Sequence, residues 1–273
     1  MEQIIEKYFR PGRLPHIWCP GCGNGIVTGA IVKAIDKLAI EKDDVAVVSG
    51  IGCSSRASGY LDFNTVHSAH GRALPVATGI KLAEPRLKVI VVTGDGDATA
   101  IGGNHFIHAA RRNIDVTVVL YNNNIYGMTG GQYSPLTPTN SKATTAQYGT
   151  VDRPFDVTEL AKGAGATYIA RSTTFHTQLL VDVIAQGIEH EGFSIIEAIT
   201  ACPISYGRQN KLGAAPNMMK WQKDHGIMLA AYNKLTNDQT EDKFPIGILY
   251  KAPAPEYTAE YDKVIAKAQK GAK

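Results

Sequence analysis

Short apolar runs alternate with amphipathic segments over the first two thirds of the chain. Apolar runs typical of buried strands lie at 45–48, 87–93, 116–121, 167–170 and 193–199. Segments with helical spacing of apolar residues lie at 24–38, 101–112, 155–163 and 175–190. Pro154 precedes the third of these segments and suits the first turn of a helix. The alternation predicts an α/β fold, with a mostly parallel sheet covered by helices on both faces.

The last quarter of the chain departs from this pattern. It contains one helical segment, around 221–235, and a proline-rich tail at 244–255. We therefore expect a first domain over residues 1–202 and a C-terminal extension over 203–273, which packs on that domain or on a partner subunit.

Composition narrows the class of protein. The 273 residues are 44% hydrophobic, which is enough for one sizeable core, and 28 basic residues against 25 acidic ones leave a net charge of +3. This balance favours neither nucleic acid nor a membrane surface as a partner. The charged N-terminus lacks the apolar core of a signal peptide, so a cytoplasmic protein is expected.

Polar clusters follow two consecutive strand-like runs. The segments 94–96 (GDG) and 122–124 (NNN) each come directly after an apolar run. Because parallel strands end at one edge of a sheet, Asp95 and Asn123 should lie close together. With the main-chain carbonyl of Ile125 they offer oxygen ligands for Mg²⁺ over a diphosphate. Either cluster alone is typical of a tight turn, whereas the pair after two strands favours the metal site.

Four cysteines form a second candidate site. Cys19 and Cys22 have the C-x-x-C spacing of zinc and iron–sulfur proteins, and Cys53 and Cys202 follow predicted strands. A zinc knuckle and a thioredoxin-like redox pair are alternatives for C-x-x-C alone. No second such pair occurs and no cysteine is left over, which favours a single four-thiolate site. Spacing does not distinguish Zn²⁺ from a [4Fe–4S] cluster.

Longer segments around these residues resemble the β subunit of 2-oxoacid:ferredoxin oxidoreductases. These segments are 18–23 (WCPGCG), 50–56 (GIGCSSR), 70–75 (HGRALP) and 126–132 (YGMTGGQ), and the resemblance extends over essentially the whole chain. It implies a thiamine diphosphate-binding fold in which Asp95, Asn123 and Ile125 hold Mg²⁺. It also implies that the four cysteines bind one [4Fe–4S] cluster.

The resemblance further implies which residues bind the cofactor. These are Ile51, Gly52, Cys53, Ser54, His70, Gly94, Asp95, Gly96, Asp97, Asn123, Ile125, Gly127, Met128 and Thr129. Arg56, near the 2-oxoacid carboxylate, and His70 are the candidate catalytic residues; a surface salt bridge is the alternative for Arg56. His67 and His70 have the spacing of a metal pair, but a loop that lines the pocket or a structural role is favoured. Thr129 suits either a phosphate contact or capping of its own loop.

One position bears on the substrate. Related proteins with pyruvate-type or broad specificity often have lysine where this chain has Gly130. Glycine removes a positive group and leaves room, which favours a longer substrate such as 2-oxoglutarate over pyruvate. The distal carboxylate of 2-oxoglutarate would then need a basic partner elsewhere.

A partner subunit is also expected. Thiamine enzymes usually take an activating glutamate from a second domain, and this chain has a single α/β unit. The resemblance implies that a separate α subunit supplies it, in an αβ or (αβ)₂ assembly. This chain alone should therefore be incomplete as a catalyst.

The predicted function is CoA-dependent oxidative decarboxylation of 2-oxoglutarate, or the reverse reductive carboxylation, with electrons passed through the cluster to ferredoxin. The alternatives are a pyruvate or broad-specificity enzyme, a non-redox thiamine diphosphate-dependent decarboxylase subunit, and a zinc-bound structural module with a degenerate cofactor fold.

Overall fold

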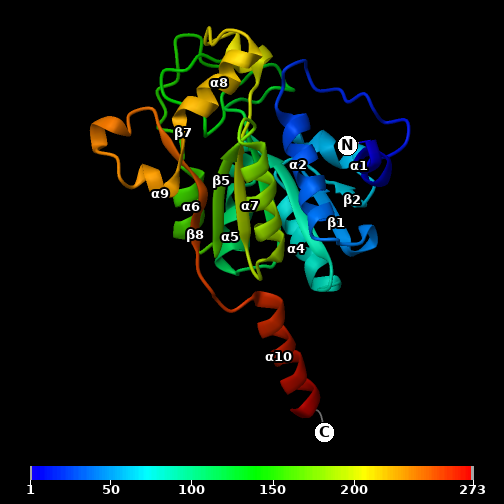
Figure 1. Ribbon diagram of the computed structural model, residues 1–273. Helices are drawn as coiled ribbons and strands as arrows, with labels where there is room; N and C mark the ends of the chain where they lie inside the picture. Colours follow the sequence, from blue (N-terminus) through cyan, green and yellow to red (C-terminus); the bar gives the residue numbers. More distant parts are fainter. Residues whose placement is uncertain (1, 272–273) are drawn as a thin grey trace.

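Strands and helices alternate through residues 2–271, the part of the chain that the computed structural model describes (Figure 1). The strands are β1 (Val45–Ser49), β2 (Asn64–His67), β3 (Lys88–Gly94), β4 (Thr117–Asn122), β5 (Tyr168–Thr173), β6 (Ser194–Ile199), β7 (Gly226–Met228) and β8 (Phe244–Lys251). Within these residues they form an eight-stranded sheet in the order β2-β1-β3-β4-β6-β5-β8-β7. Neighbours are parallel except β5 and β8, which are antiparallel. The mostly parallel sheet predicted from the sequence is therefore confirmed.

Helices cover both faces of this sheet, as predicted. They are α1 (Glu2–Tyr8), α2 (Asn24–Lys37), α3 (Ala57–Tyr60), α4 (Ala73–Ala83), α5 (Gly103–Arg111), α6 (Val157–Ala164), α7 (Thr177–Glu189), α8 (Ala215–His225), α9 (Leu229–Tyr232) and α10 (Tyr257–Gly271). Alternate residues of β1 enter two different cores: Val47 packs with α2 and α7, and Val48 packs with α4, α5 and α6. Burial on both faces explains why the strands read as continuous apolar runs.

Two helix starts differ from the prediction. Helix α6 begins at Val157, so Pro154 does not lie in its first turn. Asp156 caps the helix instead, since its carboxylate accepts hydrogen bonds from the backbone N–H groups of Thr158 and Glu159. The segment expected as one helix from 101 begins with a π-helical turn at Asp97–Ile101, followed by α5.

The segment after residue 202 also differs from the prediction. The helix expected around 221–235 starts earlier, as α8, and is interrupted by β7 before α9. The expected proline-rich tail contains β8, which pairs with β5 as a strand of the main sheet. Helix α10, which was not predicted, extends away from the sheet (Figure 1). The division into residues 1–202 and 203–273 stays a prediction. Among the described residues, no helix is long and apolar enough to cross a membrane.

The side-chain amide of Asn113 connects segments next to the starts of β4, β5 and β6. These starts lie at the edge of the sheet opposite the loops that follow β3 and β4. Oδ1 of Asn113 accepts hydrogen bonds from the N–H of Phe193 and the hydroxyl of Thr167, both at 2.8 Å. Its Nδ2 donates to the carbonyls of Pro255 at 3.0 Å and Ala254 at 3.3 Å. Asn113 therefore ties the C-terminal segment to the ends of β4, β5 and β6.

Candidate active site

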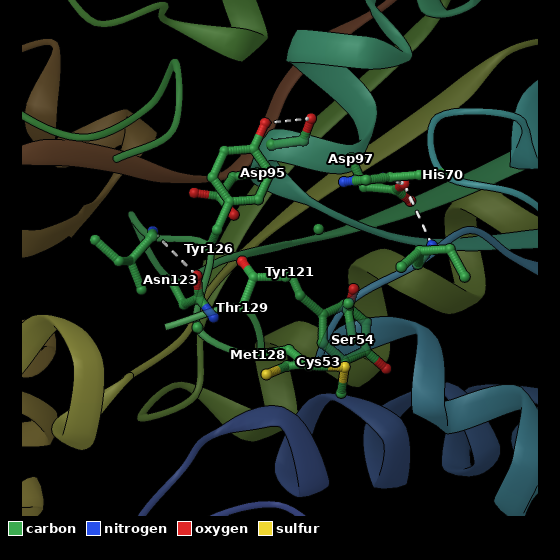
Figure 2. A pocket seen from close by; sticks show the side chains of 16 residues that line it. Cys53, Ser54, His70, Asp95, Asp97, Tyr121, Asn123, Tyr126, Met128 and Thr129 are labelled. Atoms are coloured by element: carbon green, nitrogen blue, oxygen red, sulfur yellow. Dashed lines mark hydrogen bonds and ion pairs between the residues drawn. The ribbon is translucent and has the colours of Figure 1, made fainter. Parts of the chain in front are cut away.

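Loops that follow β1, β3 and β4 meet in one pocket at the carboxyl edge of the sheet (Figure 2). The lining consists of Ile51, Gly52, Cys53, Ser54, His70, Gly94, Asp95, Gly96, Asp97, Tyr121, Asn123, Ile125, Tyr126, Gly127, Met128 and Thr129. It includes all fourteen residues expected at the cofactor, together with Tyr121 and Tyr126. The structure thus brings these segments together; cofactor binding by each residue stays a prediction.

Asp95 is one of two buried acids in the lining of this pocket. Burial raises the pKa of Asp95 to about 7, although the hydroxyl of Ser134 and the N–H groups of Gly96 and Ile125 lower it. Ser134 Oγ donates to Asp95 Oδ2 at 2.5 Å. Since burial disfavours an isolated carboxylate, a cation in the pocket would stabilise its charged form. The site therefore fits a divalent metal ion.

Asn123 lines the same pocket as Asp95, and the N–H of Ile125 lies near both side chains (Figure 2). Its Oδ1 accepts a hydrogen bond from the N–H of Ile125 at 3.2 Å, which fixes the orientation of the amide. An amide oxygen has a second lone pair, so this bond still leaves it able to bind a metal ion. The loop geometry supports the pairing of Asp95 and Asn123 predicted from their positions after two strands.

Asp97 has a different role from Asp95 because its carboxylate is occupied by the protein. Oδ1 accepts hydrogen bonds from His70 Nδ1 and from the N–H groups of Gly71 (2.7 Å) and Ile51 (3.3 Å). Oδ2 accepts from Thr93 Oγ1 at 2.8 Å. Asp97 therefore holds the turns after β1 and β2 against β3, and it shapes the wall of the pocket.

The loop after β4 closes on itself. Thr129 Oγ1 donates to the side-chain carbonyl of Gln132 at 2.6 Å, and Gln132 Nε2 donates to the carbonyl of Thr129 at 2.9 Å. These two bonds correspond to the loop-capping alternative for Thr129. Gly130 and Gly131 follow with positive φ angles of 113° and 94°, which glycine adopts without strain.

The four cysteines lie close to one another beside the pocket. Burial, together with the nearby thiols of Cys202, Cys53 and Cys19, raises the pKa of Cys22 to about 12, although a hydrogen bond from the N–H of Asn24 opposes the shift. Burial, with Cys202 and Cys19, raises the pKa of Cys53 to about 11. Each thiolate in this group disfavours ionisation of the other thiols. A positively charged centre between the sulfur atoms would stabilise the thiolate forms. The donor set therefore fits a metal centre with four thiolate ligands.

Gly127 lies beside two of these thiols, and one of them, Cys53, lines the pocket itself. A Cβ built at Gly127 would lie 3.4 Å from Cys53 Sγ and 3.6 Å from Cys202 Sγ, while Gly127 itself lines the pocket. Within residues 2–271 the cysteines form no disulfide, and no three His, Cys, Asp or Glu side chains surround a position for a single metal ion.

The structure does not bring every predicted residue to the pocket. Arg56 is exposed, at the end of the short 3₁₀ helix Ser54–Arg56, and does not line it. His67 is exposed at the end of β2, whereas His70 lines the pocket and contacts Asp97. The proposed contact between Arg56 and a substrate carboxylate stays a prediction.

Three residues of the site were missed from the sequence. Ser134 is 39 positions from the carboxylate that it contacts, and no local pattern marks it. Tyr126 donates to the carbonyl of Gly96 at 3.2 Å, and its ring lies where a side chain at position 96 would project. Tyr121 is buried at the end of β4, with its hydroxyl 3.0 Å from that of Thr28. Tyr126 lies within the segment 126–132, and Tyr121 ends the apolar run at 116–121, but neither was assigned to the site.

A larger cavity adjoins the pocket at Asn123. It has a volume of about 430 Å³ and is lined by uncharged residues, including Tyr206, Trp221 and Gln222. An anionic substrate group would find no opposite charge in this lining.

Comparisons with known proteins agree with this geometry. Residues 50–198 match the family model of the thiamine pyrophosphate enzyme C-terminal TPP binding domain. The chain is 50% identical to the 2-oxoglutarate synthase subunit KorB of Methanothermobacter marburgensis over 255 residues, covering 93% of this chain and 90% of that protein. It is also 50% identical to the KorB subunit of Methanocaldococcus jannaschii over 261 residues, covering 96% and 97%.

A solved structure extends the agreement to three dimensions. The 2-oxoglutarate:ferredoxin oxidoreductase from Magnetococcus marinus, with 2-oxoglutarate, coenzyme A and succinyl-CoA bound, matches with a TM-score of 0.83 and 32% sequence identity. The match covers 97% of this chain and 90% of that chain. The chain therefore belongs to the 2-oxoacid:ferredoxin oxidoreductase β-subunit family, among relatives named 2-oxoglutarate synthase subunit KorB, and has their thiamine pyrophosphate-binding domain.

Proposed function

We propose that this chain is the β subunit of an enzyme that oxidatively decarboxylates 2-oxoglutarate with CoA, or runs the reverse reductive carboxylation, and passes the electrons to ferredoxin. One observation carries the proposal: Cys53 lines the pocket of Asp95 and Asn123, and Gly127 of the same pocket lies beside the thiols of Cys53 and Cys202. A site for carbon chemistry and a site for electron transfer therefore lie side by side.

The residues of this chain would hold two groups. Asp95, Asn123 and the carbonyl of Ile125 would bind Mg²⁺ and so anchor the diphosphate of thiamine diphosphate. Cys19, Cys22, Cys53 and Cys202 would bind a [4Fe–4S] cluster. When bound, the thiamine supplies a nucleophilic carbon and an electron sink for 2-oxoacid chemistry, and the cluster accepts electrons one at a time.

The protein positions these groups and keeps the pocket in shape. Ser134 orients the Asp95 carboxylate, and Asp97 holds the backbone that lines the opposite wall. Gly127 lets the pocket and the thiols approach closely, since a side chain there would project toward Cys53 and Cys202.

A partner subunit completes the proposal. The uncharged cavity beside Asn123 supports a substrate pocket whose basic group comes from elsewhere, either from Arg56 or from an α subunit. The α subunit would also supply the activating glutamate, in an αβ or (αβ)₂ assembly. The names of the relatives, which are subunits, support this assignment.

The test is anaerobic purification of the chain with its α partner. We expect bound iron, acid-labile sulfide and thiamine diphosphate, and CoA-dependent dye or ferredoxin reduction that is faster with 2-oxoglutarate than with pyruvate or a branched 2-oxoacid. Asp95→Asn should lose thiamine diphosphate, while exposed Asp224→Asn should keep it.

Other results would contradict specific parts. Iron and sulfide near zero with decarboxylation intact would favour a non-redox decarboxylase. One zinc per chain without thiamine diphosphate would favour a structural module. Faster pyruvate turnover would reassign the substrate, and robust turnover by this chain alone would contradict the need for an α subunit.

A further inference from the structure

Three buried polar side chains in the described part of the molecule lack a hydrogen-bond partner. The atoms are Nδ2 and Oδ1 of Asn24, Oγ of Ser55 and Oγ1 of Thr200. Asn24 follows Cys22 by two positions, Ser55 follows Cys53 by two, and Thr200 precedes Cys202 by two. The unsatisfied groups are therefore concentrated next to three of the four cysteines.

Thr200 packs against Gly23, the residue that directly precedes Asn24. The backbone N–H of Asn24 donates to the thiol of Cys22, and Asn24 is the first residue of α2. A Cβ at Gly23 would overlap the hydroxyl of Thr200, and Gly23 N–H donates to the carbonyl of Ala201 at 3.2 Å. The hydroxyl of Thr200 therefore lies against the short segment that joins Cys22 to Asn24, although it is distant in sequence.

Ser55 approaches from a different element. It lies in the short 3₁₀ helix Ser54–Arg56, which Cys53 directly precedes, and it is fully buried. The neighbouring Ser54 points toward Gly94 in the pocket, where a Cβ would lie 3.2 Å from its hydroxyl. Each of the three side chains is thus held by the same short segment as a cysteine.

Leaving these groups unsatisfied would be costly. A buried donor without a partner costs about 1–3 kcal/mol, and native proteins contain few such groups. Comparable hydroxyls elsewhere in the sheet are satisfied: Thr117 and Ser194 both donate to the carbonyl of Gly187, at 3.0 and 2.9 Å. The concentration at the cysteines indicates an acceptor that is not part of the chain.

We propose that Asn24, Ser55 and Thr200 donate hydrogen bonds to sulfur atoms of the iron–sulfur cluster and raise its reduction potential. This inference rests on the cluster in the proposed function. Hydrogen bonds to sulfur stabilise the more negative, reduced cluster, so they shift the potential upward. Oδ1 of Asn24 accepts only, so it needs a donor such as a buried water.

The test is an EPR-monitored redox titration of the anaerobically purified complex with its α partner. The variants Thr200→Val and Ser55→Ala each remove a hydroxyl, and Asn24→Leu replaces the amide by an apolar group with the same number of heavy atoms. We expect each variant to lower the midpoint potential of the cluster. The one-electron equilibrium constant for reduction should fall by about threefold to tenfold, where tenfold corresponds to about 59 mV.

Matched controls separate this effect from general disturbance of the core. Thr117→Val and Ser194→Ala remove buried hydroxyls at the first residues of β4 and β6, which are the ends remote from the cysteines. These variants should leave the reduction potential of the cluster unchanged. Thr200→Ser keeps the hydroxyl and should restore the wild-type value. If Thr200→Val does not assemble a cluster, the reduction potentials of Ser55→Ala and Asn24→Leu still test the inference.

Two failures are distinguishable. A wild-type complex without iron and sulfide would contradict the cluster in the proposed function. If the wild-type complex contains an intact cluster and all three variants have the same reduction potential as the wild type, only this inference would be overturned. The three groups would then be satisfied by water.

Discussion

The hydroxyl of Ser134 donates a 2.5 Å hydrogen bond to Oδ2 of Asp95, across 39 residues of sequence. The carboxylate is buried in the wall of the pocket, and this contact comes from the loop after β4 rather than from strand β3, which Asp95 directly follows. The loop and the strand therefore fix one metal-ligand candidate together.

Ser134→Ala should weaken binding of Mg²⁺ and thiamine diphosphate by about tenfold, because outer hydrogen bonds orient the groups that bind a metal. Titration of the metal-free complex with Mg²⁺ at saturating cofactor, followed by calorimetry, measures the effect. Ser172→Ala is the control, since that buried hydroxyl donates to the carbonyl of His176 on another part of the sheet. Equal affinities for wild type and Ser134→Ala would show that the contact does not orient Asp95.

Asp97→Asn should lower the free energy of unfolding by about 2–4 kcal/mol, because the amide replaces an acceptor that receives several hydrogen bonds. The donors include Gly71 N–H at 2.7 Å and Thr93 Oγ1 at 2.8 Å. Urea denaturation at neutral pH provides the measurement, with exposed Asp224→Asn as control. A change below about 0.5 kcal/mol would mean that the network of Asp97 contributes little to folding.

Gly50→Ala should destabilise the fold and reduce thiamine diphosphate content. A Cβ at this position would overlap the Asp97 carboxylate, which is fixed by its own hydrogen bonds and cannot move aside easily. A loss of about 1–3 kcal/mol is expected from overpacking of this kind. Gly103→Ala is the matched control, since a Cβ there meets nothing within 4 Å. Equal melting temperatures for both variants would contradict the steric argument.

Asp156 should make the protein sensitive to acid. Burial disfavours its carboxylate, but the guanidinium of Arg171 and the N-cap bonds from Thr158 and Glu159 outweigh this and lower the pKa of Asp156 below 3.8. The stabilisation is fully present above the unfolded-state pKa near 3.8 and is lost as pH falls through the folded-state value.

Asp156→Asn keeps a capping side chain but removes the charge, so it should cost about 1 kcal/mol at pH 7 and much less at pH 3. Denaturant unfolding at both pH values tests this difference. An Asp156→Asn penalty that is the same at pH 7 and pH 3 would show that the charge is not responsible.

The strands that carry the site were predictable because burial on both faces makes them continuous apolar runs. Strand β2 was missed since it lies at the edge of the sheet, where three of its four residues are exposed and the apolar signal is weak. Strand β8 was missed because its prolines suggested a tail; Pro245 lies near its start, and Pro253 and Pro255 follow its end.

The site was predictable as far as it depends on loops that directly follow strands. Asp95 and Asn123 were placed together by the rule that parallel strands end at one edge. The Ser134 contact was not predictable, since it depends on how a long loop folds back over the sheet. The internal use of Asp97 was not predictable either, because a carboxylate in a glycine-rich turn can face the ligand or the protein.

The hydrogen bonds of Asn113 have a counterpart at the other end of the sheet. At the end remote from the pocket, one amide holds the approaches to three strands and the segment at 254–255. At the pocket end, Asp97 joins the turns after β1 and β2 to β3 in a similar way. Both ends of the sheet are therefore held by single side chains that connect several strands, so we expect the strands to keep their register when a cofactor is loaded or a partner docks.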